Sequence, residues 1–114
     1  RKVKLKADGK KPLILSEFGG KTYRAEGHVF NPDKTYGYGG CDSLEALNEA
    51  VANLYLQEVL PCVRNGLCAA IYTQVSDVED EINGLLTYDR RVLKVDPEAM
   101  THLSEQLKRA FYQG

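Results

Sequence analysis

The chain has 114 residues, 43% of them hydrophobic and 27% charged, a composition typical of one globular domain. Its 15 basic and 16 acidic side chains give a net charge of −1, which argues against a nucleic-acid-binding protein. No apolar run reaches the roughly 20 residues of a membrane span, and no signal-peptide pattern opens the sequence. The composition therefore predicts a globular protein without nucleic-acid or membrane partners.

The cysteines point to a reducing compartment. Cys41, Cys62 and Cys68 are odd in number and lack the spacing of a metal site, and the sequence contains no Asn-x-Ser/Thr acceptor. Both features favour reduced thiols in a cytoplasmic protein, and neither they nor any other motif calls for a cofactor. Because the first residue is Arg1 rather than Met, we expect the chain to be a piece of a longer protein.

The first eleven residues are strongly basic. Arg1–Lys11 contains six basic side chains, and Lys2, Lys4 and Lys6 alternate with apolar residues. A period of two indicates an extended segment with one wet face, and lysine is common on exposed sheet edges. We predict a solvated edge strand, the alternative being a basic tail for an acidic partner.

A short apolar run leads to the first candidate for chemistry. Pro12 precedes Leu13–Leu15, and Gly19-Gly20 follow soon after. This pattern predicts a strand buried on both faces, as in a parallel sheet, with Glu17 as its last residue. Since α/β enzymes bind ligands where strands end, Glu17 is a candidate catalytic carboxylate. The alternative is a solvated or lysine-paired Glu17 without chemical function.

The connection from Phe18 to Cys41 is long, rich in glycine and without periodicity. After Phe18 it carries four more aromatic side chains, which are Tyr23, Phe30, Tyr36 and Tyr38. A long loop without its own secondary structure is uncommon unless it is functional. Two interpretations remain open: the aromatics stack on a sugar or another flat ligand, or they form a small core of the loop itself.

Two helices and a second strand follow. After a cap at Asp42 or Ser43, apolar residues at helical spacing predict a helix to about Leu60, namely Leu44, Leu47, Val51, Leu54 and Tyr55. Leu67–Tyr72 predicts a second strand buried on both faces. Asp96-Pro97 begins the last helix, with an apolar stripe at Met100, Leu103, Leu107 and Phe111.

The predicted order is strand, long loop, helix, strand, long loop, helix. Such alternation indicates an α/β fold with parallel strands covered by helices. Two strands do not form a stable parallel sheet alone, because such sheets need both faces covered and several neighbours. We therefore expect a fraction of a larger α/β fold.

The second loop carries a dense group of acidic residues, which are Asp77, Glu79, Asp80 and Glu81. Calcium is one interpretation, but the group lacks the alternating ligands and the glycine of a calcium loop. A solvated face is the preferred interpretation, so no metal site is predicted. The two histidines, His28 and His102, stand alone in the sequence.

Three segments resemble, in the same order, the closing part of the catalytic barrel in family 2 glycoside hydrolases: KPLILSEFGG, EGHVFNPDKTYGYG and GLCAAIYTQVSDVEDEINGLLTYDRRVLKVD. That family includes β-galactosidases and β-glucuronidases. The resemblance implies the C-terminal part of a (β/α)8 TIM barrel, with Leu13–Glu17 as the seventh strand and Leu67–Gln74 as the eighth. It also implies that Glu17 is the nucleophile of a retaining β-glycosidase.

The resemblance extends to substrate binding. Tyr72 stands where relatives usually have a tryptophan lining the sugar site, and Tyr36 and Tyr38 are further candidates for carbohydrate contact. The family's acid/base carboxylate comes from the fourth strand, outside the matched segments. The expected partners are thus a carbohydrate substrate and the remaining barrel strands of the parent protein, and we expect the isolated fragment to be inactive and to self-associate. The alternatives are a non-catalytic α/β carbohydrate-binding or assembly module, and a metal-binding domain built on the acidic loop.

Overall fold

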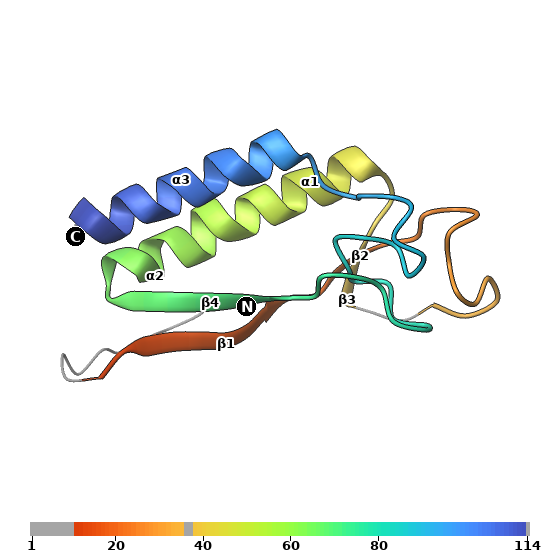
Figure 1. The fold of residues 1–114 in the computed structure, drawn as a ribbon, viewed down its shortest axis with the longest axis horizontal. Helices are drawn as coiled ribbons and strands as arrows, with labels where there is room; N and C mark the ends of the chain where they lie inside the picture. Colours follow the sequence, from red (N-terminus) through yellow and green to blue (C-terminus); the bar gives the residue numbers. More distant parts are fainter. Residues whose placement is uncertain (1–10, 36–37, 114) are drawn as a thin grey trace.

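The computed structural model describes residues 11–35 and 38–113 (Figure 1). It confirms an α/β protein with small parallel sheets; its elements are β1 (Leu13–Gly19), β2 (Lys21–Tyr23), β3 (Tyr38–Cys41), α1 (Leu44–Asn53), the π-helical segment η1 (Leu54–Val59), α2 (Leu60–Arg64), β4 (Leu67–Thr73) and α3 (Pro97–Gln113). The edge strand predicted at Lys2–Lys6 lies outside the described residues. Within them, no helix is long and apolar enough to cross a membrane.

Strands β1 and β4 run parallel, and the helices lie on one face of this pair (Figure 1). Leu13, Leu15 and Phe18 of β1 lie on the covered face, where they pack against the buried residues Val59 and Cys62 of the helices and Leu67 of β4. A second core cluster contains Leu47, Val51 and Val95.

The opposite face of the sheet is open in the described chain. Ile14 and Ile71 are 55% and 57% exposed, because side chains alternate between the faces of a strand and the helices cover only one face. The prediction that both strands are buried on both faces is therefore wrong for this chain as it stands.

The helical region begins at Leu44 because the Ser43 hydroxyl accepts a hydrogen bond from the Ala46 amide at 3.0 Å. Ser43, rather than Asp42, is the cap. The helical chain then continues beyond the predicted end at Leu60, through Pro61 to Arg64. The backbone widens into η1, which ends two residues before Pro61. In a regular helix the proline ring would collide with the backbone carbonyl one turn earlier, and the wider η1 avoids this collision.

The long connection after β1 is not structureless. It contains β2 and β3, which pair in parallel, with Thr22 opposite Gly40, and both strands contact α1. The prediction missed them because β2 has only three residues and two of the four residues of β3 are glycines, so neither shows a recognisable period of two.

The last helix begins as predicted, since the Asp96 carboxylate accepts a hydrogen bond from the Glu98 amide at 3.1 Å. Leu103 and Ala110 are buried on α3. Phe111 is 48% exposed, so the predicted apolar stripe does not reach it.

Replacing the most buried leucine of α1 should show how strongly the fold depends on this core. Leu47 is 1% exposed, and Leu47→Ala should lower the free energy of unfolding by about 3 kcal/mol, since it leaves a cavity. Leu44→Ala, at an exposed position of the same helix, should lower it by less than about 1 kcal/mol. Urea denaturation followed by circular dichroism measures both, and equal losses would contradict the described packing of α1.

Candidate functional site

Glu17 lies at a bulge near the C-terminal end of β1. Leu15 pairs with Ala70 and Phe18 pairs with Tyr72, so two residues of β1, Ser16 and Glu17, lie opposite a single residue of β4. Bulges re-aim side chains and are frequent beside active sites, although they are rare in parallel pairs. Because β1 continues to Gly19, the predicted strand end at Glu17 was two residues early.

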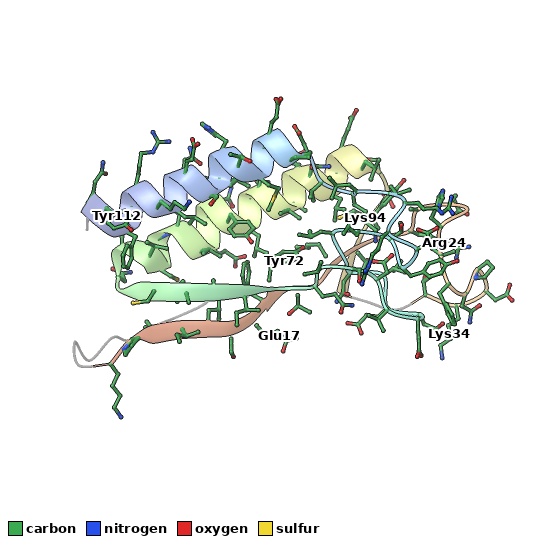
Figure 2. All side chains as sticks on the ribbon, viewed as in Figure 1. Glu17, Arg24, Lys34, Tyr72, Lys94 and Tyr112 are labelled. Atoms are coloured by element: carbon green, nitrogen blue, oxygen red, sulfur yellow. The ribbon has the colours of Figure 1, made fainter. Side chains whose placement is uncertain are left out.

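The bulge leaves Glu17 exposed on the open face of the sheet. In Figure 2 its side chain points away from the helices. Phe18, the next residue, turns to the covered face, where its ring meets Tyr55 edge-on with centroids 5.3 Å apart. Glu17 is therefore a solvent-accessible carboxylate at the end of the sheet from which both long loops depart.

Tyr72 lies on the other face, between the sheet and the helices (Figure 2). Its ring is 5.4 Å from that of Phe18 and 6.2 Å from that of Tyr55, centroid to centroid. Burial, with smaller contributions from Tyr55 and Cys41, raises the pKa of Tyr72 to about 12. The structure thus does not bring Tyr72 and Glu17 together, and in the described chain Tyr72 packs in the core.

Two of the tyrosines predicted to contact sugar, Tyr36 and Tyr38, come from the first loop. Tyr36 lies outside the described residues, and Tyr38 is the first residue of β3, paired with Lys21. Sugar contact by either residue stays a prediction.

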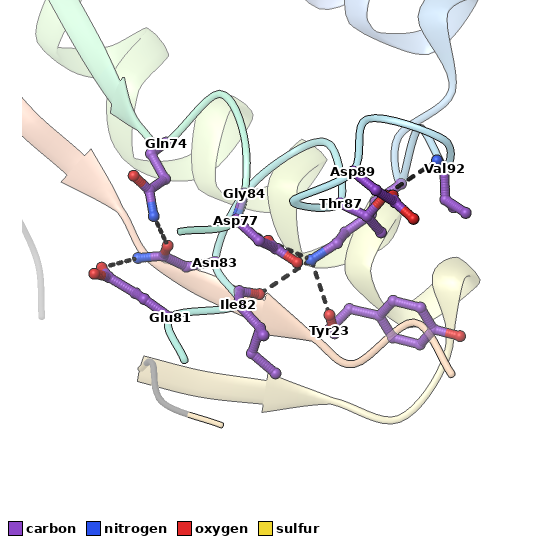
Figure 3. Close-up of polar contacts among 11 residues, drawn as sticks. Tyr23, Gln74, Asp77, Glu81, Ile82, Asn83, Gly84, Thr87, Asp89 and Val92 are labelled. Atoms are coloured by element: carbon purple, nitrogen blue, oxygen red, sulfur yellow. Dashed lines mark hydrogen bonds and ion pairs between the residues drawn. The ribbon is translucent and has the colours of Figure 1, made fainter. Parts of the chain in front are cut away.

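A buried ion pair organises the second loop. The Lys94 ammonium donates hydrogen bonds to Asp77 Oδ1 at 2.8 Å, to the Tyr23 carbonyl at 2.9 Å and to the Ile82 carbonyl at 3.1 Å (Figure 3). The side chains of Lys94 and Asp77 are 0% and 2% exposed. The prediction of a solvated acidic face is therefore wrong for Asp77.

Burial and pairing act in opposite directions on these two groups. Burial raises the pKa of Asp77 and lowers that of Lys94, while the hydrogen bond between them opposes both shifts. Asp77 Oδ1 also accepts a hydrogen bond from the Gly84 amide at 2.8 Å. A side chain at Gly84 would collide with the backbone of Ser76 and Asp77, so this close approach requires glycine.

The other acidic residues do not gather into a metal site. Within residues 11–35 and 38–113, no group of three or more His, Cys, Asp or Glu side chains is placed to hold a metal ion. Glu81 instead accepts a hydrogen bond from Asn83, which in turn accepts one from Gln74 (Figure 3). These contacts fold the loop back on itself.

The sequence position of His28 suggested an isolated residue, but in the structure His28 has a partner. Its Nδ1 lies 2.8 Å from Asp89 Oδ2, and Asp89 also accepts hydrogen bonds from the Thr87 hydroxyl and the Arg91 amide. The hydrogen bonds from Thr87 and then His28 hold the pKa of Asp89 well below its usual range. This link joins the two long loops, and sequence patterns could not reveal it because 61 residues separate its ends. His102, by contrast, is exposed on α3.

Asn48 fastens α1 to the end of the second loop. Its side chain donates to the Lys94 carbonyl at 2.9 Å and accepts from the Asp96 amide at 2.7 Å. The neighbouring Glu49 is exposed on α1.

Comparisons with protein-family models and with curated proteins find no match to this chain. What the described residues offer is an accessible carboxylate, Glu17, on the open face of a parallel sheet. The loops that follow β1 and β4 extend from the same end of that sheet (Figure 1). The ion pair of Lys94 with Asp77 and the contact of His28 with Asp89 stabilise these loops.

The ion pair between Lys94 and Asp77 yields a prediction about stability. Lys94→Met keeps much of the side-chain volume but leaves the Asp77 charge buried and unpaired, so the free energy of unfolding should fall by about 3–5 kcal/mol. Lys34→Met, at an exposed position, should change it by less than about 0.5 kcal/mol. Adding Asp77→Asn to Lys94→Met should restore part of the loss. Chemical denaturation measures all three, and an unchanged Lys94→Met protein would contradict the pair's role.

The His28–Asp89 link predicts a pH dependence. Because its hydrogen bonds lower the pKa of Asp89 from the ordinary 3.8, ionised Asp89 stabilises the fold above that value, and the contribution is lost as the pH falls further. Asp89→Asn should therefore be less stable than wild type at pH 6, and the difference should shrink below about pH 4. Urea unfolding at a series of pH values tests this. A difference that stays constant from pH 6 to pH 3 would contradict it.

Proposed function

We propose that this chain forms the closing part of the (β/α)8 barrel of a retaining β-glycosidase, with β1 and β4 as its seventh and eighth strands. Glu17 then supplies the nucleophile. The observation that carries the proposal is the placement of Glu17, exposed at a bulge near the C-terminal end of a strand and on the uncovered face. Barrel enzymes place catalytic residues at the C-terminal ends of their strands.

The one-sided sheet supports the barrel. Two successive strand–loop–helix units have parallel strands with helices on one face only, which is the arrangement within a (β/α)8 wall. The open face, where Ile14 and Ile71 are exposed, corresponds to the barrel interior. Beside β4 an apolar groove of about 370 Å³, lined by residues such as Ala70, Leu103 and Leu107, is open to a neighbouring unit.

The reaction assigned to Glu17 proceeds in two steps. Its carboxylate attacks the anomeric carbon and forms a covalent glycosyl ester, while a second carboxylate about 5–5.5 Å away protonates the departing oxygen. That second group then removes a proton from water, which cleaves the ester and regenerates Glu17. A strand holds the nucleophile more rigidly than a loop does, and the bulge turns it out of the covered face.

The proposal also defines partners. The substrate is a carbohydrate, the acid/base carboxylate comes from another strand of the parent, and the mechanism needs no cofactor. The isolated segment is expected to self-associate, because it exposes apolar surface to water. This surface consists of Ile14, Ile71 and the groove beside β4. The three cysteines are thiols in the structure, which supports a cytoplasmic parent.

Glu17→Gln in the full-length protein tests the function. Loss of the attacking carboxylate should lower turnover of an aryl β-glycoside by several orders of magnitude while the fold is kept. Glu98→Gln, exposed at the start of α3, is the matched control and should retain wild-type turnover.

A second measurement identifies the covalent step. Treatment of wild type with an activated 2-deoxy-2-fluoro-β-glycoside should leave a sugar on the peptide that contains Glu17, detected by mass spectrometry. Turnover by Glu17→Gln close to wild type, or a label on another residue, would overturn the assignment. Binding of the glycoside without turnover by wild type would instead favour a non-catalytic carbohydrate-binding module.

A further inference from the structure

Two aromatic rings lie exposed and in contact where the long loops meet. Phe30, from the loop after β1, and Tyr88, from the loop after β4, meet edge to face, with centroids 5.8 Å apart and an interplanar angle of 83°. Phe30 is 58% exposed and Tyr88 is 43% exposed. The contact joins the loops but leaves a large part of each ring open to a ligand.

A polar group held in a fixed orientation stands next to these rings in the chain. His28 is two residues from Phe30, and Asp89 follows Tyr88. Because Nδ1 of His28 is engaged by Asp89, the imidazole orientation is set and Nε2 is the nitrogen left for another partner. The buried Thr87 hydroxyl holds Asp89 in turn. Two exposed aromatic rings and one oriented polar group, carried by the same two loops, are components of a small-molecule site.

We propose that Phe30, Tyr88 and His28 form a second sugar subsite, which binds the leaving-group side of a β-linked disaccharide or longer carbohydrate. The apolar face of the sugar ring lies against the aromatic rings, and His28 Nε2 hydrogen-bonds a hydroxyl. This inference rests on the proposed glycosidase function.

The place of these residues explains why the subsite belongs to the leaving group. The sugar whose bond is cleaved must have its anomeric carbon at Glu17, on the sheet itself. The loops that carry Phe30 and Tyr88 extend beyond the C-terminal ends of β1 and β4 (Figure 1). They therefore reach the part of the substrate farther from the reacting carbon.

The experiment compares substrates with and without a leaving-group sugar, in the full-length protein. Phe30→Ala and Tyr88→Ala should each raise KM for lactose or cellobiose about tenfold, the scale of losing one well-placed aromatic contact and its buried area. KM for the matching β-glycosyl fluoride, whose leaving group is one atom, should change by less than about twofold. Phe30→Tyr should retain the wild-type KM, and Phe111→Ala, an exposed ring on α3, should change neither value.

Binding without turnover separates this inference from the function on which it rests. Saturation-transfer NMR of lactose and cellobiose with the Glu17→Gln protein should show contact, and Phe30→Ala in that background should weaken the contact of the leaving-group sugar. Unchanged disaccharide KM and contact in both alanine variants, or no contact at all, would overturn the subsite. Equal rises of KM for the fluoride and the disaccharides would also overturn it, since they would show a structural role only. A Glu17→Gln protein that still turns over the substrate would instead overturn the proposed nucleophile.

Discussion

The arrangement of both loops depends on the buried ammonium of Lys94. Its three donors meet Asp77 and the carbonyls of Tyr23 and Ile82, so one side chain joins β2, the second loop and the approach to α3. Removing an ammonium from water is unfavourable by several kcal/mol, and only a full set of acceptors with a counter-charge offsets it. The contacts of Lys94 therefore tolerate little rearrangement of either loop.

The same ion pair bears on Glu17 through the backbone. β2 begins one residue after Gly20, whose amide donates to the Thr73 carbonyl at 3.0 Å. Fixing the Tyr23 carbonyl at Lys94 and Gly20 at β4 restrains the chain on the C-terminal side of the bulge. The chain is thus restrained on both sides of Glu17, by the pairing of β1 with β4 before it and by the contacts of Gly20 and Tyr23 after it.

Local patterns predicted the parts of this fold that depend on neighbours in sequence. The two long strands, the start of α1 and the Asp96 cap of α3 all follow from apolar periodicity and capping residues, and the structure confirms them. What the patterns missed joins residues far apart, since 71 positions separate Lys94 from Tyr23 and 61 separate His28 from Asp89. Nothing local distinguishes Lys94 from an exposed lysine, or His28 from an isolated histidine.

The bulge is the clearest case of tertiary packing overriding the pattern. A regular strand through Leu15–Phe18 would place Leu15 and Phe18 on opposite faces, because three positions separate them. The core needs both, Leu15 against the cluster of Val59 and Phe18 against Tyr55, so one extra residue is inserted between them.

Packing at Tyr72 then holds the end of the strand in place. A Cβ on Gly19 would lie 2.7 Å from the Tyr72 ring, and Gly19 has φ +105°, so only glycine lets the strand lie this close. Glu17 consequently faces away from the helices, because Leu15 and Phe18 on either side of the bulge pack against them. A smaller residue at Phe18 or Tyr72 would leave the end of β1 less firmly packed and so make the position of the Glu17 carboxylate less fixed, although neither ring contacts that carboxylate. The aromatic core on the covered face of the sheet thus determines the orientation of Glu17 on the open face.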